Sequence, residues 1–318
     1  MFPLGDKELR IGILGFTEGN GHPYSWSAMF NNYNHEEMET CGFPVIPRYL
    51  EKQPDETLGI PGAKITCVCC TGFAGRDEAE HIARAAKIPT VYDRPEEMIG
   101  NVDAVIVATD DGNEHVDRCR PFIEAGIPMF IDKPLVNTEE DLRTFVEWRK
   151  QGAKFISGSS MRYCKDQEPF YTNRYELGKI KYIMSPMAKY YEHYGIHALE
   201  RMYPFLGQGF LSVRNTGTKE KTVVHIKHKN GCDVNIIQSY GMACTGMVVM
   251  AEHQALIFDT GDSYYCFKKQ LDLFVHWLRT GEEPFPFEET IELMKLVIGG
   301  LRSREEGGRE VFLDEIKV

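Results

Sequence analysis

Apolar residues in the first 135 positions form short continuous runs, each followed by a polar loop and a segment with helical spacing. The runs lie at 10–16, 64–71, 102–109 and 129–131. A short apolar run bounded by turn residues is typical of a strand buried on both faces. Strand, helix and strand in succession form βαβ units, whose strands lie parallel. This part of the chain therefore predicts a parallel sheet, with helices expected at about 24–33, 77–87 and 116–125.

Residues 35–62 interrupt this pattern. They contain many Pro, Gly and acidic residues and show no clear hydrophobic period. We expect an irregular insertion there, between the first helix and the second strand.

Beyond Gly152 the segments change in character. They resemble longer strands separated by hairpin turns such as Lys229-Asn230-Gly231, which predicts a mostly antiparallel sheet. We expect two domains, 1–135 and 136–318, with the last helices able to pack back on the first domain. The strands expected in the second domain lie at 155–162, 223–229, 233–239 and 255–258, and its late amphipathic helices at 271–279 and 288–302.

Composition narrows the class of protein. The chain has 318 residues, of which 42% are hydrophobic and 26% charged, as in a globular protein. A net charge of -11 favours small-molecule ligands and argues against nucleic-acid or anionic-membrane partners. No apolar run approaches the roughly 20 residues that cross a bilayer. The first residues lack a basic region followed by an apolar core, so we expect no signal peptide. Nine cysteines, several in apolar runs, indicate reduced thiols and a cytoplasmic location.

Lys133 is the most informative candidate for chemistry. It follows the apolar run 129–131 directly and precedes Pro134, which restricts the chain after it. Ligands of open parallel sheets bind beyond the carboxyl ends of the strands, where Lys133 is expected. The alternative is an ordinary surface lysine.

The loop after the first strand is the candidate phosphate-binding element. A dinucleotide fingerprint needs Gly at positions 15, 17 and 20, and this chain has Gly15, Thr17 and Asn20, with Gly19 and Gly21 displaced by one. Such a loop brings backbone N–H groups and a helix N-terminus against a pyrophosphate. A plain tight turn is the alternative.

The second strand ends without the acid that usually binds the adenosine ribose. Arg76, a few residues on, suits a 2′-phosphate and hence NADP, or is a solvated loop residue. A metal site is one interpretation of the cysteines in the second strand, Cys67, Cys69 and Cys70. Consecutive strand residues point to opposite faces, however, so we predict buried thiols and no metal.

These motifs together resemble one enzyme family. Lys133-Pro134, the strand before His115 and the terminal segment from Phe285 resemble the glucose–fructose oxidoreductase, inositol dehydrogenase and rhizopine-catabolism family. The resemblance implies a Rossmann-type parallel sheet followed by an α+β domain with a large, mostly antiparallel sheet. It implies NAD or NADP as cofactor, and cofactor contacts from Gly12, Gly15, Thr17, Thr109, Asp110, His115 and Lys133.

The same resemblance points to the segment around His197. Family members place an aspartate four residues before this histidine and an acid three after it, and this chain has His193 and Glu200 there. His193 and His197 share a helix face, and neutral imidazole can take the proton of an alcohol while a nicotinamide takes the hydride. We predict His197 and Lys133 as catalytic residues, with His193 assisting. Two alternatives apply to this pair. His193 and His197 can be histidines packed between the domains, or they can form a metal site with Glu192.

Substrate contacts are expected from Arg162, Tyr163 and Tyr194, although a tyrosine-rich core is an alternative for the two tyrosines. The expected activity is oxidation or reduction of a sugar, cyclitol or related polyol, in a homodimer or homotetramer assembled through the open face of the second sheet. An NAD-using glycosidase or lyase with transient oxidation, and a non-catalytic binding or regulatory protein, are the alternatives. The dehydrogenase hypothesis requires Lys133 and His197 to converge.

Overall fold

The structure is a computed structural model that describes residues 2–243, 246–259 and 262–318. The chain divides into two compact units. The domain limits expected from the sequence, and the roles given to those domains, stay predictions. Unit 1 comprises Met1–Asp132, Glu147–Ser157 and Phe267–Pro284, and unit 2 comprises Lys133–Val146, Gly158–Cys266 and Phe285–Val318.

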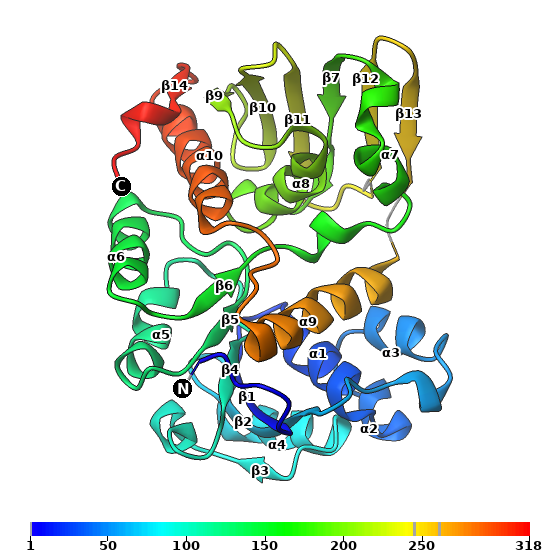
Figure 1. Ribbon diagram of the computed structural model, residues 1–318, viewed down its shortest axis with the longest axis vertical. Coiled ribbons are helices and arrows are strands. Elements are labelled where there is room, and N and C mark those ends of the chain that lie inside the picture. The colour runs from blue at the N-terminus through cyan, green and yellow to red at the C-terminus, as the bar shows by residue number, and fades with distance from the viewer. Residues whose placement is uncertain (1, 244–245, 260–261) are drawn as a thin grey trace. The chain divides into compact units, whose positions relative to one another are not determined.

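Unit 1 is built on a six-stranded parallel sheet with the order β3-β2-β1-β4-β5-β6 (Figure 1). This is the strand order of a doubly wound dinucleotide-binding sheet, so the predicted Rossmann-type fold is confirmed. The central strands are buried along almost their whole length, which is why they appear in the sequence as continuous apolar runs. The strands are β1 (Leu9–Gly15), β2 (Ala63–Cys70), β3 (Thr90–Val91), β4 (Ala104–Val107), β5 (Met129–Ile131) and β6 (Phe155–Ser157).

Three predicted helices of unit 1 are confirmed with small shifts of their ends. They are α1 (His22–Asn31), α4 (Gly75–Ala85) and α5 (His115–Glu124), and a 3-10 turn, η2 (Pro95–Met98), lies between the last two. Pro23 occupies the first turn of α1, where its missing N–H removes no helical hydrogen bond.

The expectation of an irregular segment at 35–62 is wrong. The segment contains α2 (His35–Glu39), α3 (Val45–Leu50) and the turn η1 (Asp55–Thr57). Asn34 caps α2 by accepting from the N–H groups of Glu36 and Glu37. Helices of five or six residues span less than two turns, so no hydrophobic period develops in them.

The strand expected at 155–162 is also corrected. Only Phe155–Ser157 is extended, and it pairs parallel with β5 as the sixth strand of the unit 1 sheet. The chain then turns into η3 (Ser160–Tyr163), whose N-cap Ser159 accepts from the N–H of Met161. The chain between β5 and β6 contains α6 (Glu139–Lys150), a helical connection of the kind that parallel neighbours require.

Unit 2 contains an eight-stranded mixed sheet with the order β13-β12-β7-β11-β10-β9-β14, and β8 also pairs with β11. Most pairs are antiparallel, as predicted, whereas β11 pairs parallel with β7 and β8. Residues of β10 alternate between buried and exposed, so one face is covered and the other is open. The strands are β7 (Ile180–Met184), β8 (Met187–Ala188), β9 (Phe210–Asn215), β10 (Lys221–His228), β11 (Asp233–Ser239), β12 (Met247–Ala251), β13 (Ala255–Phe258) and β14 (Val311–Phe312).

Two helices of unit 2 pack closely together. Tyr191 in α8 donates from its hydroxyl to the carbonyl of Leu296 in α10 at 3.0 Å. A Cβ at Gly300 would lie 2.6 Å from the Tyr191 hydroxyl oxygen, so only glycine permits this approach. The helices with a part in unit 2 are α6 (Glu139–Lys150), α7 (Glu168–Thr172), α8 (Tyr191–Leu206), α9 (Ser263–Thr280) and α10 (Phe287–Glu305), with turns η4 (Arg174–Leu177) and η5 (Leu313–Glu315). Of these, α6 and α9 continue into unit 1. No helix within the described ranges has the length and apolar character needed to cross a membrane.

Candidate functional site

The loop after β1 has the features of an anion-binding turn. A Cβ at Gly15 would lie 3.0 Å from Cγ of Pro23, so glycine lets β1 and α1 approach closely. Gly19 has φ +80 and open space beside it. Across the described residues, the backbone N–H groups of Thr17, Glu18 and Gly19 donate no hydrogen bond to another backbone group. These donors are therefore available to a ligand.

Four of the predicted cofactor residues meet beyond β1 and β4. The hydroxyl of Thr17 accepts from the N–H of Asp110 at 3.3 Å, and Nε2 of His115 lies 2.7 Å from the carbonyl oxygen of Thr109. Thr109 Oγ1 is buried and has no hydrogen-bond partner among the residues that the structure describes. Gly12 lies inside β1 instead, where a Cβ would come 2.9 Å from Sδ of Met98, so its geometry indicates close packing.

A buried carboxylate, which was not among the predicted site residues, ties this loop to β5. Oδ2 of Asp132 lies 2.5 Å from Nδ1 of His22 and accepts from the Asn20 side chain at 3.1 Å. Asn20 in turn accepts from the N–H of His22 at 2.9 Å. Asn20 therefore fills the position of the third fingerprint glycine with an amide that holds the loop in shape.

A cavity of about 360 Å³ opens in unit 1 beyond the end of β2. Arg118 lies on its wall and donates to the hydroxyl of Thr71 at 2.6 Å, while its guanidinium also pairs with Glu114. Arg76 pairs instead with Glu80 and Asp93 on the exposed surface. Sequence reasoning missed Arg118, although its position one turn after Glu114, near the start of α5, was a usable signal. The cavity is lined by Thr71, Pro95, Glu96, Asn113, Glu114, Asp117, Arg118 and Pro121.

In unit 2, the aromatic ring of Tyr194 brings Lys133 and His197 together. Nζ of Lys133 lies 4.8 Å from the ring centre, and the imidazole of His197 meets the ring edge-on at 4.7 Å between centres. Lys133 is only 2% exposed, although lysine side chains are rarely buried. The ammonium and imidazole that the hypothesis requires thus share one neighbour.

Ser159 and Glu200 fix the position of His197. Oγ of Ser159 lies 2.6 Å from Nδ1 of His197, so this contact holds one of the two ring nitrogens. Glu200 accepts from the N–H of Ser159 at 3.2 Å and from Nε of Arg162 at 2.5 Å. Burial raises the pKa of Glu200, and the charge of Arg162 opposes that rise. The acid three residues after His197 therefore holds the turn that carries Ser159.

The remaining predicted substrate and catalytic residues lie nearby in unit 2, and their roles stay predictions. Burial alone would lower the pKa of Arg162, but its ion pairs with Glu200 and Glu289, both at 2.5 Å, raise it. Burial raises the pKa of Tyr163, so its phenol stays protonated. His193 is half-buried, one turn before His197 in α8.

Lys189 was also missed by sequence reasoning. Its Nζ donates to the hydroxyl of Tyr194 at 2.7 Å and lies 4.3 Å from the ring centre. Nothing in the local sequence distinguishes this lysine, because its role depends on how the chain between β8 and α8 turns back on Tyr194.

The cysteines of β2 are buried thiols. Burial raises the pKa of Cys67 and of Cys69 to about 12. In the part of the chain that the structure describes, no group of three or more His, Cys, Asp or Glu side chains is arranged to hold a metal ion.

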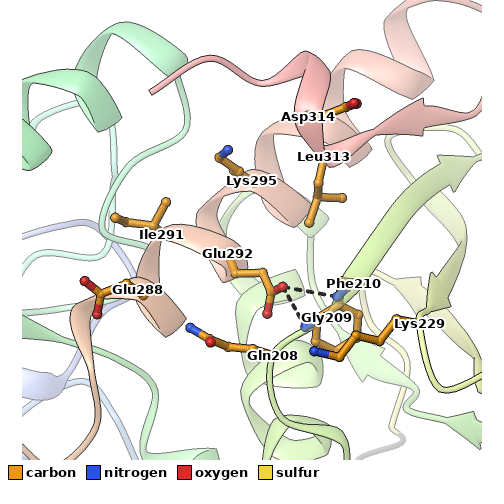
Figure 2. A pocket seen from close by; sticks show the side chains of 10 residues that line it. All are labelled: Gln208, Gly209, Phe210, Lys229, Glu288, Ile291, Glu292, Lys295, Leu313 and Asp314. Carbon is orange, nitrogen blue, oxygen red and sulfur yellow. Dashed lines mark hydrogen bonds between the residues drawn. The ribbon is translucent and has the colours of Figure 1, made fainter.

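A second cavity, of about 480 Å³, lies elsewhere in unit 2 (Figure 2). Glu292 in α10 accepts there from the N–H groups of Gly209 and Phe210, at 2.8 and 3.1 Å, and from the Tyr203 hydroxyl. None of the predicted catalytic residues lines this cavity, and its half-buried carboxylate, Glu292, is occupied in holding β9 to α10.

Comparison with known proteins shows which family part of the chain is similar to. Residues 40–158 match a family model described as an oxidoreductase family with an NAD-binding Rossmann fold. Over this segment the chain is similar to that oxidoreductase family. The family resemblance seen in the sequence is thereby confirmed, and NAD is the cofactor that the family's description names. No curated protein matches the chain.

Solved structures match nearly the whole chain. Myo-inositol 2-dehydrogenase from Lactobacillus plantarum has a TM-score of 0.74 at 16% identity, covering 96% of this chain and 99% of its own. Scyllo-inositol dehydrogenase from Lactobacillus casei, solved with NAD(H) and scyllo-inositol, has a TM-score of 0.73 at 13% identity, covering 97% and 100%. A myo-inositol dehydrogenase from Corynebacterium glutamicum scores 0.71 at 17% identity, covering 96% and 98%. At these identities the likeness shows the fold.

The residues of unit 1 fit a dinucleotide. The N–H groups of the loop after β1 suit a pyrophosphate, and the unpartnered Thr109 hydroxyl can bind a polar atom of the cofactor. The open space beside Gly19 admits a ligand close to the backbone. The donor set is therefore complementary to an anionic cofactor.

Proposed function

We propose that the protein is an NAD-dependent dehydrogenase acting on a CH–OH group of a sugar, cyclitol or related polyol. The observation that carries the proposal is the shared contact of Lys133 and His197 with Tyr194. An alcohol oxidation needs a proton acceptor and a positive charge near the reacting oxygen, and these two residues supply them.

His197 is the proposed proton acceptor in oxidation and donor in reduction. When Nδ1 donates to Ser159, Nε2 of the neutral imidazole carries a lone pair and can take the hydroxyl proton. Lys133 is proposed to stabilise the developing negative charge on the substrate oxygen and to orient the nicotinamide. His193 is proposed to assist, and Arg162, Tyr163 and Tyr194 to contact the substrate. Bound NAD would accept the hydride from the substrate carbon.

We propose Gly12, Gly15, Thr17, Thr109, Asp110, His115 and Lys133 as cofactor contacts. The cavity beyond β2 is the proposed site of the adenosine end. Its carboxylates from Glu96, Glu114 and Asp117 can accept hydrogen bonds from ribose hydroxyls but would repel a 2′-phosphate. This favours NAD over NADP.

A homodimer or homotetramer and a cytoplasmic location complete the proposal. The open face of the unit 2 sheet exposes Tyr182, Ile237 and Ile257, which suits burial against a second copy. The eight cysteines that the structure describes are free, as reduced thiols would be in the cytoplasm.

The test is spectrophotometric. Myo-inositol, scyllo-inositol and a panel of sugars are incubated with the protein and NAD, and the reduced-nicotinamide absorbance is followed. Accumulation with at least one compound supports a dehydrogenase. Product without net reduced cofactor would instead indicate a glycosidase or lyase with transient oxidation. Calorimetric titration that detects binding of neither NAD nor NADP would indicate a non-catalytic protein.

A further inference from the structure

Lys189 occupies an unusual position at the start of the helix that carries His197. It lies between β8 and α8 with φ +60, in the left-handed region that non-glycine residues seldom adopt. Such a conformation costs on the order of 1 kcal/mol and persists only where the surrounding structure enforces it. The surrounding structure thus holds the backbone at this lysine in an uncommon conformation.

The side chain of Lys189 contacts Tyr194. Nζ of Lys189 donates to the Tyr194 hydroxyl at 2.7 Å, and the side chain is half-buried. No carboxylate among the residues the structure describes pairs with it. Two other lysines of unit 2 are neutralised by carboxylates: Lys219 pairs with Glu192 at 3.6 Å and Lys181 with Glu252 at 2.7 Å. Lys189 therefore has unused capacity for an anion, because an ammonium has three donors and Tyr194 takes one.

A second cation contacts the same aromatic ring. Nζ of Lys133 lies 4.8 Å from the ring centre and that of Lys189 lies 4.3 Å from it. A negatively charged group bound beside the Tyr194 hydroxyl would compensate the charge of Lys189. The local positive charge also stands out against the net charge of -11.

We infer that the substrate is an anionic sugar or polyol derivative, and that Lys189, with the Tyr194 hydroxyl, binds its carboxylate or phosphate. This rests on the proposed function and specifies its substrate class. A neutral cyclitol would leave the Lys189 charge uncompensated. Lysine suits either anion because it acts as a compact point charge.

The experiment compares matched neutral and charged probes on the full-length protein with NAD. Glucose, glucuronate and glucose 6-phosphate differ at one carbon only, so the carboxylate and phosphate arms separate the two anions. For each probe, kcat/KM from NADH formation and Kd by calorimetry with the NAD-loaded protein are measured. We expect at least one anion to be preferred over glucose by about tenfold or more, as for a charge-assisted hydrogen bond.

Three variants test whether Lys189 causes the preference for charged probes. Lys189→Met keeps the stem and should reduce the charged-to-neutral preference about 10- to 100-fold, whereas Lys189→Arg keeps the charge and should retain most of it. Lys219→Met removes a lysine already paired with Glu192 and should leave the preference unchanged. NAD affinity and the circular dichroism spectrum check that each variant is folded.

Two results overturn the inference while the proposed function stands. One is that NAD binds but neither anion binds or reacts better than glucose. The other is that Lys189→Met weakens charged and neutral probes equally, which would give Lys189 only a role in placing Tyr194. A protein that binds no NAD and turns over no probe would overturn the proposed function itself, and the inference with it.

Discussion

The two sheets of this protein bury their strands in different ways. In unit 1, neighbouring residues of β4 such as Val105 and Ile106 are both fully buried, because the parallel sheet is covered on both faces. In β11 of unit 2, Ile236 is fully buried while Ile237 is 44% exposed. A strand of the parallel sheet therefore needs an apolar residue at every position, whereas a strand of the mixed sheet needs one only at every second position.

The polar groups of the candidate site are also placed differently in the two units. Unit 1 holds its polar groups beyond the strand ends, where Asp132, Asn20 and His22 form one network. Unit 2 holds His197 and Tyr194 on a helix, α8, beside Lys133 and Lys189. The comparison suggests that cofactor binding and proton transfer can be altered separately.

The largest expected effect tests this separation in unit 2. His197→Asn should lower kcat about 10²- to 10⁴-fold, the usual contribution of a general acid or base. NAD affinity, measured by calorimetry, should remain as in the wild type because the loop proposed to bind the cofactor lies in unit 1. A variant that loses NAD affinity in parallel with kcat would contradict the division.

The next prediction tests the two sheets directly. Val105→Ala, Ile106→Ala and Ile236→Ala should each lower the free energy of unfolding, by about 2–5 kcal/mol for the isoleucines and somewhat less for the valine. Ile237→Ala should change it by less than about 0.5 kcal/mol in a monomer. Denaturant unfolding gives these values, and size-exclusion chromatography of Ile237→Asp tests whether the open face is an interface. If Ile236→Ala and Ile237→Ala lowered the free energy of unfolding of a monomer equally, this face of the sheet would not be open.

A smaller effect is expected for the network of unit 1. Asp132→Asn removes the charge that Asn20 and His22 share, so the glycine loop should lose its fixed shape. We expect NAD affinity to fall about tenfold, equivalent to roughly 1.4 kcal/mol. His197→Asn serves as the matched control, since it lies outside this network. Unchanged NAD affinity in Asp132→Asn would show that the network does not shape the cofactor loop.

The smallest expected effect depends on pH. Burial would raise the pKa of Asp103, but hydrogen bonds from Arg10 and Lys7 outweigh it and lower the pKa to about 2. Stability from this lowered pKa is present above the unfolded-state pKa of about 4 and is lost as pH falls toward 2. Asp103→Asn should therefore destabilise the protein by about 1 kcal/mol at pH 7, after allowance for screening. The difference should shrink between pH 4 and 2 in denaturant unfolding, and a difference independent of pH would disprove the linkage.

Much of the fold was predictable because its signals are local. The buried strands of unit 1 appear as apolar runs, and Lys229-Asn230-Gly231 marks the β10–β11 hairpin, where Gly231 has φ +82. The helices at 35–57 were missed because they are too short to show a period. The final strand of the parallel sheet was misplaced because its three residues, Phe155–Ser157, do not reveal which neighbour they pair with.

By itself, the sequence determined the fold class, the family resemblance and the residue types of the candidate site, Lys133 and His197 among them. Only the tertiary structure decided which side chains meet: Asn20 reaches Asp132 across 112 positions, and Ser159 reaches His197 across 38. It also placed Lys189 against Tyr194. The reason is physical: hydrophobic period and turn residues act between near neighbours in the chain, whereas side-chain contacts depend on which strand ends and helix faces packing brings together.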